Sequence, residues 1–232
     1  MTSIQLIDND YEWKNCSLIQ FLSEGNIPIE WKDFFIDNIE ILENISNSIS
    51  STKIIYPSVQ RVFRAFYMTP LSNIKIVIVG QDCYHNGNAT GLCFDVKNGS
   101  IINPSLKNIY KELKLEGFTP TEDGNLSHLP SQGVLLINAA LTVAKGEADS
   151  HTEYWYPFTE NLIKYISKNT HNVSWLLMGK RAQEFKEYIN SETHKIVETS
   201  HPSPFSAMRG YGNIPSFINS DCFKQLGHNI RW

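Results

Sequence analysis

Residues 74–85 read IKIVIVGQDCYH, a short apolar run that passes directly into a group of polar and reactive side chains. The run at 74–79 is rich in β-branched residues and ends at Gly80, which is typical of a strand buried on both faces. Similar apolar runs follow at residues 134–137 (VLLI), 173–178 (VSWLLM) and 195–199 (KIVET). Each of these runs predicts one further buried strand.

Helical patterns lie between and after the apolar runs, at residues 104–115, 158–166, 181–188 and 217–226. Strands that alternate with helices favour a parallel sheet covered on both faces. We therefore predict an α/β fold, a three-layer α/β/α sandwich with a central four-stranded, mostly parallel sheet.

The chain before the first predicted strand has a different character. Residues 1–50 predict mostly helix, and residues 57–67 (PSVQRVFRAFY) predict another helix with one apolar face. A chain of 232 residues, 41% of them hydrophobic, is long enough for one sizeable core. We expect a single domain over residues 1–232, with an acidic, mostly helical N-terminal segment (1–56) and a catalytic core (57–232).

Charge is unevenly distributed along the chain, whose net charge is −4. Residues 1–50 hold nine acidic and two basic side chains, which gives −7. Residues 51–232 hold fifteen acidic and eighteen basic side chains, which gives +3. Any surface that contacts phosphate is therefore expected in the later part of the chain.

Several protein classes are disfavoured by the sequence. No apolar run approaches the roughly 18 residues that a membrane span needs, and the N-terminus does not read as a secretory signal. The four cysteines are scattered and form no CxxC pair, which weighs against disulfides, zinc fingers and an iron–sulfur cluster. We expect reduced thiols, no membrane association, and a location in the nucleus or cytoplasm.

Three of the predicted strands are followed by polar side chains. Gln81 and Asp82 follow the first strand, Asn138 follows the second, and His201 follows the last. In open α/β sheets, ligands bind beyond the carboxyl ends of the strands. We therefore expect these side chains to share one crevice.

The residue types at these strand ends suit cleavage of a glycosidic bond, which builds positive charge on the sugar and negative charge on the leaving base. Asp82 can stabilise the cation and orient a water, and His201 can donate a hydrogen bond to the departing base. The amide of Asn138 can both accept and donate along the edge of a base. Taken from the residues alone, a capping role for Asp82 and an ordinary loop role for His201 stay open.

Five segments carry a resemblance to a known family. Residues 80–85 (GQDCYH) are similar to the water-activating loop GQDPYH of the family-1 uracil-DNA glycosylases. Further matches are residues 89–94 (ATGLCF), 103–113 (NPSLKNIYKEL), 132–138 (QGVLLIN) and 201–206 (HPSPFS), the last followed by Arg209 and Gly210. They occur in family order between about residue 63 and residue 232, so chance is a poor explanation.

The resemblance implies a DNA-repair enzyme that flips uracil out of single- or double-stranded DNA, hydrolyses its N-glycosidic bond and leaves an abasic site. It implies no cofactor and no metal. It assigns catalysis to Asp82 and His201, with His201 donating to uracil O2. It assigns the uracil pocket to Gln81, Tyr84, Phe94 and Asn138.

Within that pocket, Tyr84 is implied to exclude the thymine methyl group, and Phe94 to stack on the flipped base. Plain core packing is the alternative for Phe94. Backbone groups of Gln81 are expected to add contacts to the base.

Two loops are expected to grip the DNA backbone on either side of the flipped nucleotide, because prolines stiffen them and serines offer donors. Phe205 is expected to wedge into the vacated stack, with Arg209 and His151 supporting the same surface. The expected DNA-binding residues are Pro104, Ser105, Ser203, Pro204, Phe205, Ser206 and Arg209. A proteinaceous glycosylase inhibitor and a replication protein are the further partners considered.

The sequence departs from the family pattern at a few positions. Cys83 replaces a proline and Phe205 replaces the leucine wedge, while Asp95 stands at a serine position and Met178 at a tryptophan position. The loop from residue 85 to residue 94 is one residue shorter than usual. These differences bear on rate and on the fit of DNA and leave Asp82, Asn138 and His201 in place.

Three other functions compete with this interpretation. A DNA-binding or processivity subunit on the same fold would use residues 1–50 as a partner surface, although plain core-covering helices are the favoured explanation of that segment. A metal hydrolase would use Asp82, His85 and His201, but the chain lacks an HExxH-type pair. A basic nucleic-acid module is disfavoured because the chain has no run of Lys and Arg.

Overall fold

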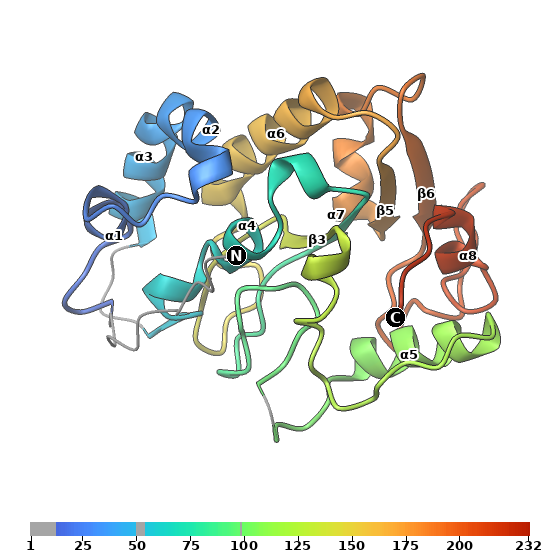
Figure 1. Ribbon diagram of the computed structural model, residues 1–232. Coiled ribbons are helices and arrows are strands. Elements are labelled where there is room, and N and C mark those ends of the chain that lie inside the picture. The colour runs from blue at the N-terminus through green and yellow to red at the C-terminus, as the bar shows by residue number, and fades with distance from the viewer. Residues whose placement is uncertain (1–12, 50–53, 98) are drawn as a thin grey trace.

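The centre of the molecule is a four-stranded sheet whose strands all run parallel. Figure 1 shows the computed structural model, which describes residues 13–49, 54–97 and 99–232. The strand order is β3-β2-β5-β6, with β2 at Ile76–Gly80, β3 at Val134–Asn138, β5 at Ser174–Met178 and β6 at Lys195–Thr199. Every residue of β2, β3 and β5 is buried, as expected for strands covered on both faces. The predicted α/β fold with its four-stranded sheet is confirmed.

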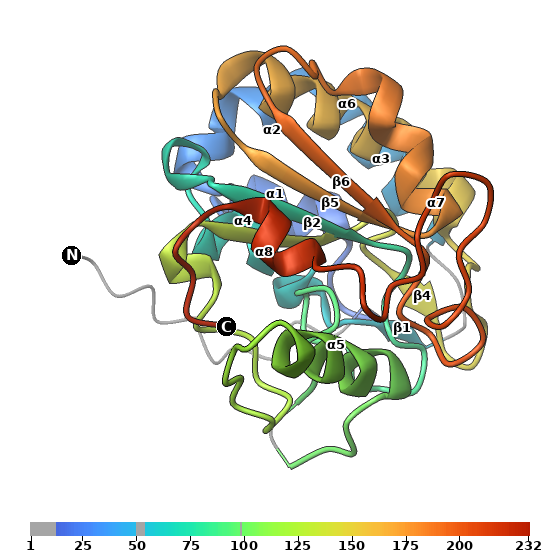
Figure 2. The same ribbon diagram turned by 90° about the vertical axis from the view of Figure 1, so that its right-hand side faces the viewer.

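Helices cover both faces of this sheet (Figure 2). One side carries α6 (Thr152–Asn169) together with α2 (Lys32–Asp37) and α3 (Ile39–Ile49), and the other carries α5 (Pro104–Leu115) and α8 (Cys222–Leu226). The described residues also form three short helices: α1 (Leu18–Ser23), α4 (Arg64–Met68) and α7 (Lys180–Gln183). A small antiparallel pair, β1 (Ile55–Tyr56) and β4 (Val143–Ala144), was not expected from the sequence.

The N-terminal helices belong to the same hydrophobic core as the sheet. The rings of Phe35 and Phe63 meet edge to face at 4.8 Å between centroids, and Phe34 meets Phe158 of α6 at 5.2 Å. Edge-to-face pairs of this kind add to the free energy gained by burial. The helical prediction holds for residues 13–49; its extension to residues 1–12 and 50 lies outside the described residues.

The helix predicted over residues 57–67 is only partly correct, because the segment is helical at both ends but broken in the middle. A 3₁₀ turn at Val59–Arg61 is separated from α4 by Phe63, whose φ of −101° and ψ of 21° leave helical geometry. The ring of Phe63 is completely buried between Phe35 and Trp155, so tertiary packing overrides the local pattern.

Two other predicted helices are shorter than expected and one is longer. At 181–188 the chain forms α7 and then a 3₁₀ turn at Glu184–Tyr188. At 217–226 only Cys222–Leu226 is helical, because Asn219 and Asp221 adopt left-handed conformations with φ of 65° and 52°. The helix predicted at 158–166 extends at both ends to form α6. Within the described ranges, no helix is both long and apolar enough to cross a membrane.

Candidate active site

Two neighbouring strands bring the first polar groups together. Gly80 at the end of β2 is the register partner of Asn138 at the end of β3. A Cβ atom at position 80 would lie 2.4 Å from Asn138 Oδ1, so any larger residue here would displace that amide. The glycine that ends the strand is thus required for the Asn138 amide to occupy its position.

Asp82 is held by a residue from a distant part of the chain. Its Oδ2 accepts the main-chain N–H of Asp149 at 2.8 Å. Burial raises the pKa of Asp82, and the negative charge of Asp149 raises it further, whereas the Asp149 N–H and the nearby His85 act to lower it. The carboxylate is therefore desolvated yet oriented, which suits a group that faces a developing cation.

Gln81 turns its side chain toward the same distant residue. Its Nε2 donates to both carboxylate oxygens of Asp149, at 2.8 and 2.9 Å. Its main-chain oxygen accepts from Ala140 N at 3.0 Å, which fixes the backbone beside the end of β3. Asp149 was missed by sequence reasoning, since no motif marks it.

His201 has a defined protonation pattern. Its Nδ1 accepts the main-chain N–H of Ser203 at 3.1 Å, so the neutral ring carries its proton on Nε2. Burial lowers the pKa of His201, which favours the neutral ring. Gly179 lets His201 pack closely against the main chain, because a Cβ atom at position 179 would lie 2.9 Å from His201 Cβ. The ring is thus a neutral hydrogen-bond donor.

Cys83 supports the amide of Asn138. Asn138 Nδ2 donates to Cys83 Sγ at 3.5 Å, and the thiol donates to Ala140 O at 3.5 Å. Burial raises the pKa of Cys83 to about 12, so it stays a neutral thiol. The residue that replaces the family proline therefore gives the amide a weak partner.

Tyr84 and Phe94 connect the Asp82 loop to His201. The Tyr84 hydroxyl donates to Phe94 O at 3.2 Å, and burial raises the pKa of Tyr84. Phe94 adopts a left-handed φ of 62° and its half-buried ring lies 6.3 Å from the His201 ring. Phe94 also packs against the main core, so its packing role and its place beside His201 coexist.

The two proposed DNA loops are joined to each other. Ser105 lies at the start of α5, and Asn108 of the same helix donates through Nδ2 to Pro202 O at 2.8 Å. The loop after His201 is exposed at Pro204, Phe205 and Arg209, whereas Ser203 and Ser206 are half-buried. Phe205 has 88% of its surface exposed, which is unusual for an aromatic residue without a partner surface.

His151 does not lie at this surface as the sequence suggested. It is 6% exposed, and its Nδ1 lies 2.8 Å from Thr142 Oγ1, which also accepts from Trp155 Nε1 at 2.7 Å. This buried chain supports the segment between β4 and α6 from inside.

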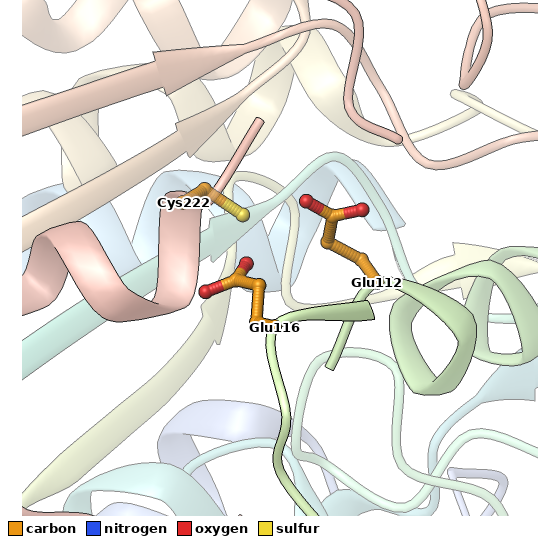
Figure 3. A group of neighbouring side chains, drawn as sticks. All are labelled: Glu112, Glu116 and Cys222. Atoms are coloured by element: carbon orange, nitrogen blue, oxygen red, sulfur yellow. The ribbon is translucent and has the colours of Figure 1, made fainter. Parts of the chain in front are cut away.

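A possible metal-binding group lies elsewhere. Within the described ranges, Glu112, Glu116 and Cys222 form the one cluster with suitable ligand spacing (Figure 3). Asp82, His85 and His201 form no such cluster. Both glutamates are occupied by main-chain N–H donors: Glu112 by Asn219, Ser220 and Asp221, and Glu116 by Phe223 and Lys224. The pair therefore holds α5 against the start of α8 and is structural.

The fold and the strand-end residues together define an enzyme that acts on a nucleobase. The sheet edge presents a carboxylate, a neutral imidazole donor and a buried amide, beside an exposed aromatic side chain. Residues 66–226 match the model of the uracil DNA glycosylase superfamily, and the chain belongs to that family. It is a DNA-repair hydrolase that cleaves the N-glycosidic bond of uracil in DNA.

Named relatives and solved structures agree with this assignment. A uracil-DNA glycosylase from Azobacteroides pseudotrichonymphae is 41% identical over 217 residues, which covers 88% of this chain and 98% of the relative. One from Francisella tularensis is 44% identical over 191 residues, covering 81% and 86%. The crystal structure of mimivirus uracil-DNA glycosylase aligns with a TM-score of 0.80 at 29% identity, covering 85% of this chain and 80% of that one.

Proposed function

We propose that the chain is a family-1 uracil-DNA glycosylase in which Asp82 and His201 perform the reaction. The observation that carries the proposal is the pairing of an oriented carboxylate with a neutral ring whose proton is on Nε2. A carboxylate stabilises the sugar cation, and an N–H donor stabilises the departing base. The loop GQDCYH and the loop HPSPFS supply these two groups.

The reaction then proceeds without a covalent intermediate. The bond between uracil N1 and sugar C1′ breaks, and its electron pair leaves with the base. His201 Nε2–H donates to uracil O2, which carries part of the new negative charge. Asp82 stabilises the sugar cation and orients a water, whose oxygen bonds to C1′. As the water bonds to C1′ it gives up one proton to the Asp82 carboxylate, and the uracil anion takes up a proton on release, so the products are free uracil and an abasic site.

Base selection rests on Asn138 and Tyr84. The Asn138 amide accepts from uracil N3–H and donates to O4, a pattern that cytosine cannot match. Tyr84 fills the space beside C5 and excludes the thymine methyl group, and its bond to Phe94 O fixes its hydroxyl. Phe94 provides a stacking face, and the main chain of Gln81 adds contacts to the base.

DNA is gripped by the loops at the other side of the site. Pro104 and Ser105 contact the backbone on one side of the flipped nucleotide, and Ser203, Pro204 and Ser206 contact it on the other. The exposed Phe205 fills the gap in the stack, and Arg209 contributes positive charge. Both single- and double-stranded uracil DNA are substrates.

Partners and location follow from the same assignment. A variant of the mimivirus enzyme has been solved in complex with UGI, and we propose that a protein inhibitor of this kind binds here. A replication protein is a further proposed partner. All four cysteines are free and buried, which supports a location in the nucleus or cytoplasm.

The test is release of free uracil from an oligonucleotide with one uracil, in EDTA, beside matched strands with thymine or cytosine. Asp82→Asn is the inactive variant, and Asp123→Asn, an exposed acid on another loop, is the matched control. We expect release from the uracil strand by wild type and by Asp123→Asn alone. Equal release by Asp82→Asn, or loss of release in EDTA, would contradict the proposal.

A further inference from the structure

The turn between β4 and α6, residues 145–150, closes over the loop that carries the catalytic carboxylate. Gly146 N donates to His85 O at 3.0 Å at one end of that loop. Asp149 contacts both Asp82 and Gln81 at the other end. The 145–150 turn therefore makes hydrogen bonds to the 80–85 loop at two points, although the bonded residues are more than sixty positions apart in the sequence.

Asp149 makes its two contacts with different parts of the residue. Its main-chain N–H donates to Asp82 Oδ2, while its carboxylate accepts both bonds from Gln81 Nε2. Bonds to a charged acceptor are shorter and stronger than neutral ones. One residue thus fixes the direction of the Asp82 carboxylate and the position of the Gln81 side chain immediately before it.

The conformation of Asp149 is what aims its N–H. Its φ is 60°, in the left-handed region that glycine, asparagine and aspartate tolerate and that β-branched residues avoid. The start of α6 holds it in place: Thr152 N donates to Asp149 O at 3.2 Å, and Thr152 Oγ1 donates to Asp149 Oδ1 at 3.3 Å. A strained backbone held by its neighbours is typical of functional sites.

We propose that Asp149 is a positioning residue for glycosidic cleavage, acting through the main-chain N–H that holds Asp82 and through the charge it places beside that carboxylate. The proposal rests on the proposed role of Asp82. Asp149 does not touch the reacting atoms. It sets the direction of the carboxylate and the acidity at which that carboxylate becomes active.

Because Asp149 is charged, removing its charge should shift the pH dependence of activity in a defined direction. Burial and the Asp149 charge raise the pKa of Asp82, whereas the Asp149 N–H, His85 and the main-chain N–H of Asp82 itself lower it; the adjacent Cys83 is a neutral thiol. Asp82 must be ionised to act. Removing the Asp149 charge lowers the pKa of Asp82, so activity persists to lower pH.

Three substitutions separate the charge from the N–H. Asp149→Asn and Asp149→Gly both keep the left-handed backbone and its N–H but remove the charge. Asp149→Val removes the charge and also disfavours the backbone conformation that aims the N–H. Glu153→Gln, at an exposed position in the first turn of α6, is the control for loss of charge alone.

The measurement is the single-turnover rate of uracil release as a function of pH, with affinity for a uracil-containing oligonucleotide measured alongside. We expect Asp149→Asn and Asp149→Gly to move the acidic limb of the pH–rate profile to lower pH. Their plateau rates should stay within about threefold of wild type, because Asp82 stays oriented. The shift should shrink as salt is added, because the Asp149 side chain is exposed. Asp149→Val should lower the plateau rate by about 10²-fold while the affinity for the oligonucleotide is kept, since misplacing a reacting group costs about that much in rate.

If the pH–rate profiles of Asp149→Asn and Asp149→Gly superimpose on those of Glu153→Gln and wild type, the proposal is overturned. A folded Asp149→Val variant with a plateau rate within about threefold of wild type would overturn it as well. If the Asp149→Val variant fails to fold, the acidic limbs of the Asp149→Asn and Asp149→Gly profiles decide whether the proposal holds. Failure of the proposed function is distinguishable, because Asp82→Asn would then retain uracil release whatever the Asp149 variants do.

Discussion

The Asp82 side of the site and the loop after His201 are built in opposite ways. The loop at residues 80–85 is tied to Asp149, Ala140 and Gly146; Cys83 within it is buried and Asp82 is half-buried. The loop at residues 203–209 exposes Phe205 almost completely, and Met208 is 65% exposed. Chemistry needs groups that are oriented before DNA arrives, whereas a wedge needs a surface that DNA can cover.

This contrast teaches that the two sides should fail differently when they are altered. Changes on the buried side should lower the rate of bond cleavage on every substrate. Changes on the exposed loop should lower engagement of duplex DNA and leave cleavage of an already flipped or single-stranded uracil nearly intact.

Among the variants that test this contrast, the largest effect is expected for His201→Leu, which keeps similar bulk but removes the Nε2–H donor. Loss of one preorganised donor costs about 10²–10³-fold in rate, so cleavage should fall by that factor on single and double strands alike. Single-turnover rates on both substrates are the measurement. The exposed His171→Leu is the control, and a loss confined to duplex DNA would break the contrast.

Gly80→Ala should have the next largest effect. The added methyl group would meet Asn138 Oδ1 at 2.4 Å and Cys93 Cβ at 3.0 Å, so the amide must move. A displacement of about 1 Å costs roughly 10²-fold in rate. Cleavage rate and unfolding temperature should be measured together, and a variant that is folded and fully active would show that Asn138 is not held as described.

The buried side was largely predictable from sequence, because strands and their terminal residues follow from apolar runs and the direction of a parallel sheet. Gln81, Asp82 and Asn138 came from that logic. Asp149 did not, since its contacts depend on a left-handed backbone and on the 67 residues that separate it from Asp82. The broken helix around Phe63 was missed for a similar reason, because its geometry is set by rings from distant helices.

Phe205→Ala probes the exposed loop. Without the ring, nothing fills the gap left by the flipped base, and unstacking costs a few kcal/mol. Activity on duplex DNA should therefore fall by about tenfold or more, with a much smaller loss on single strands. Rates on matched single- and double-stranded oligonucleotides test this, and equal losses on both would refute the wedge.

Cys83→Ala should give the smallest effect. It removes the weak acceptor beside Asn138 Nδ2, and a neutral hydrogen bond of this kind is worth a twofold to fivefold change, roughly. Uracil release should fall by that factor while cytosine is still rejected. Cys16→Ala, another buried cysteine outside the site, is the control. Loss of discrimination against cytosine would show that the thiol does more than support the amide.

We conclude that the buried side of the site is oriented for chemistry before DNA binds. The most direct test is the ¹⁵N NMR spectrum of the His201 ring in the free protein at neutral pH, assigned with the His201→Leu variant. We expect a neutral ring with its proton on Nε2 and an unprotonated Nδ1 that accepts from Ser203. A doubly protonated ring, or a neutral ring with its proton on Nδ1, would contradict it.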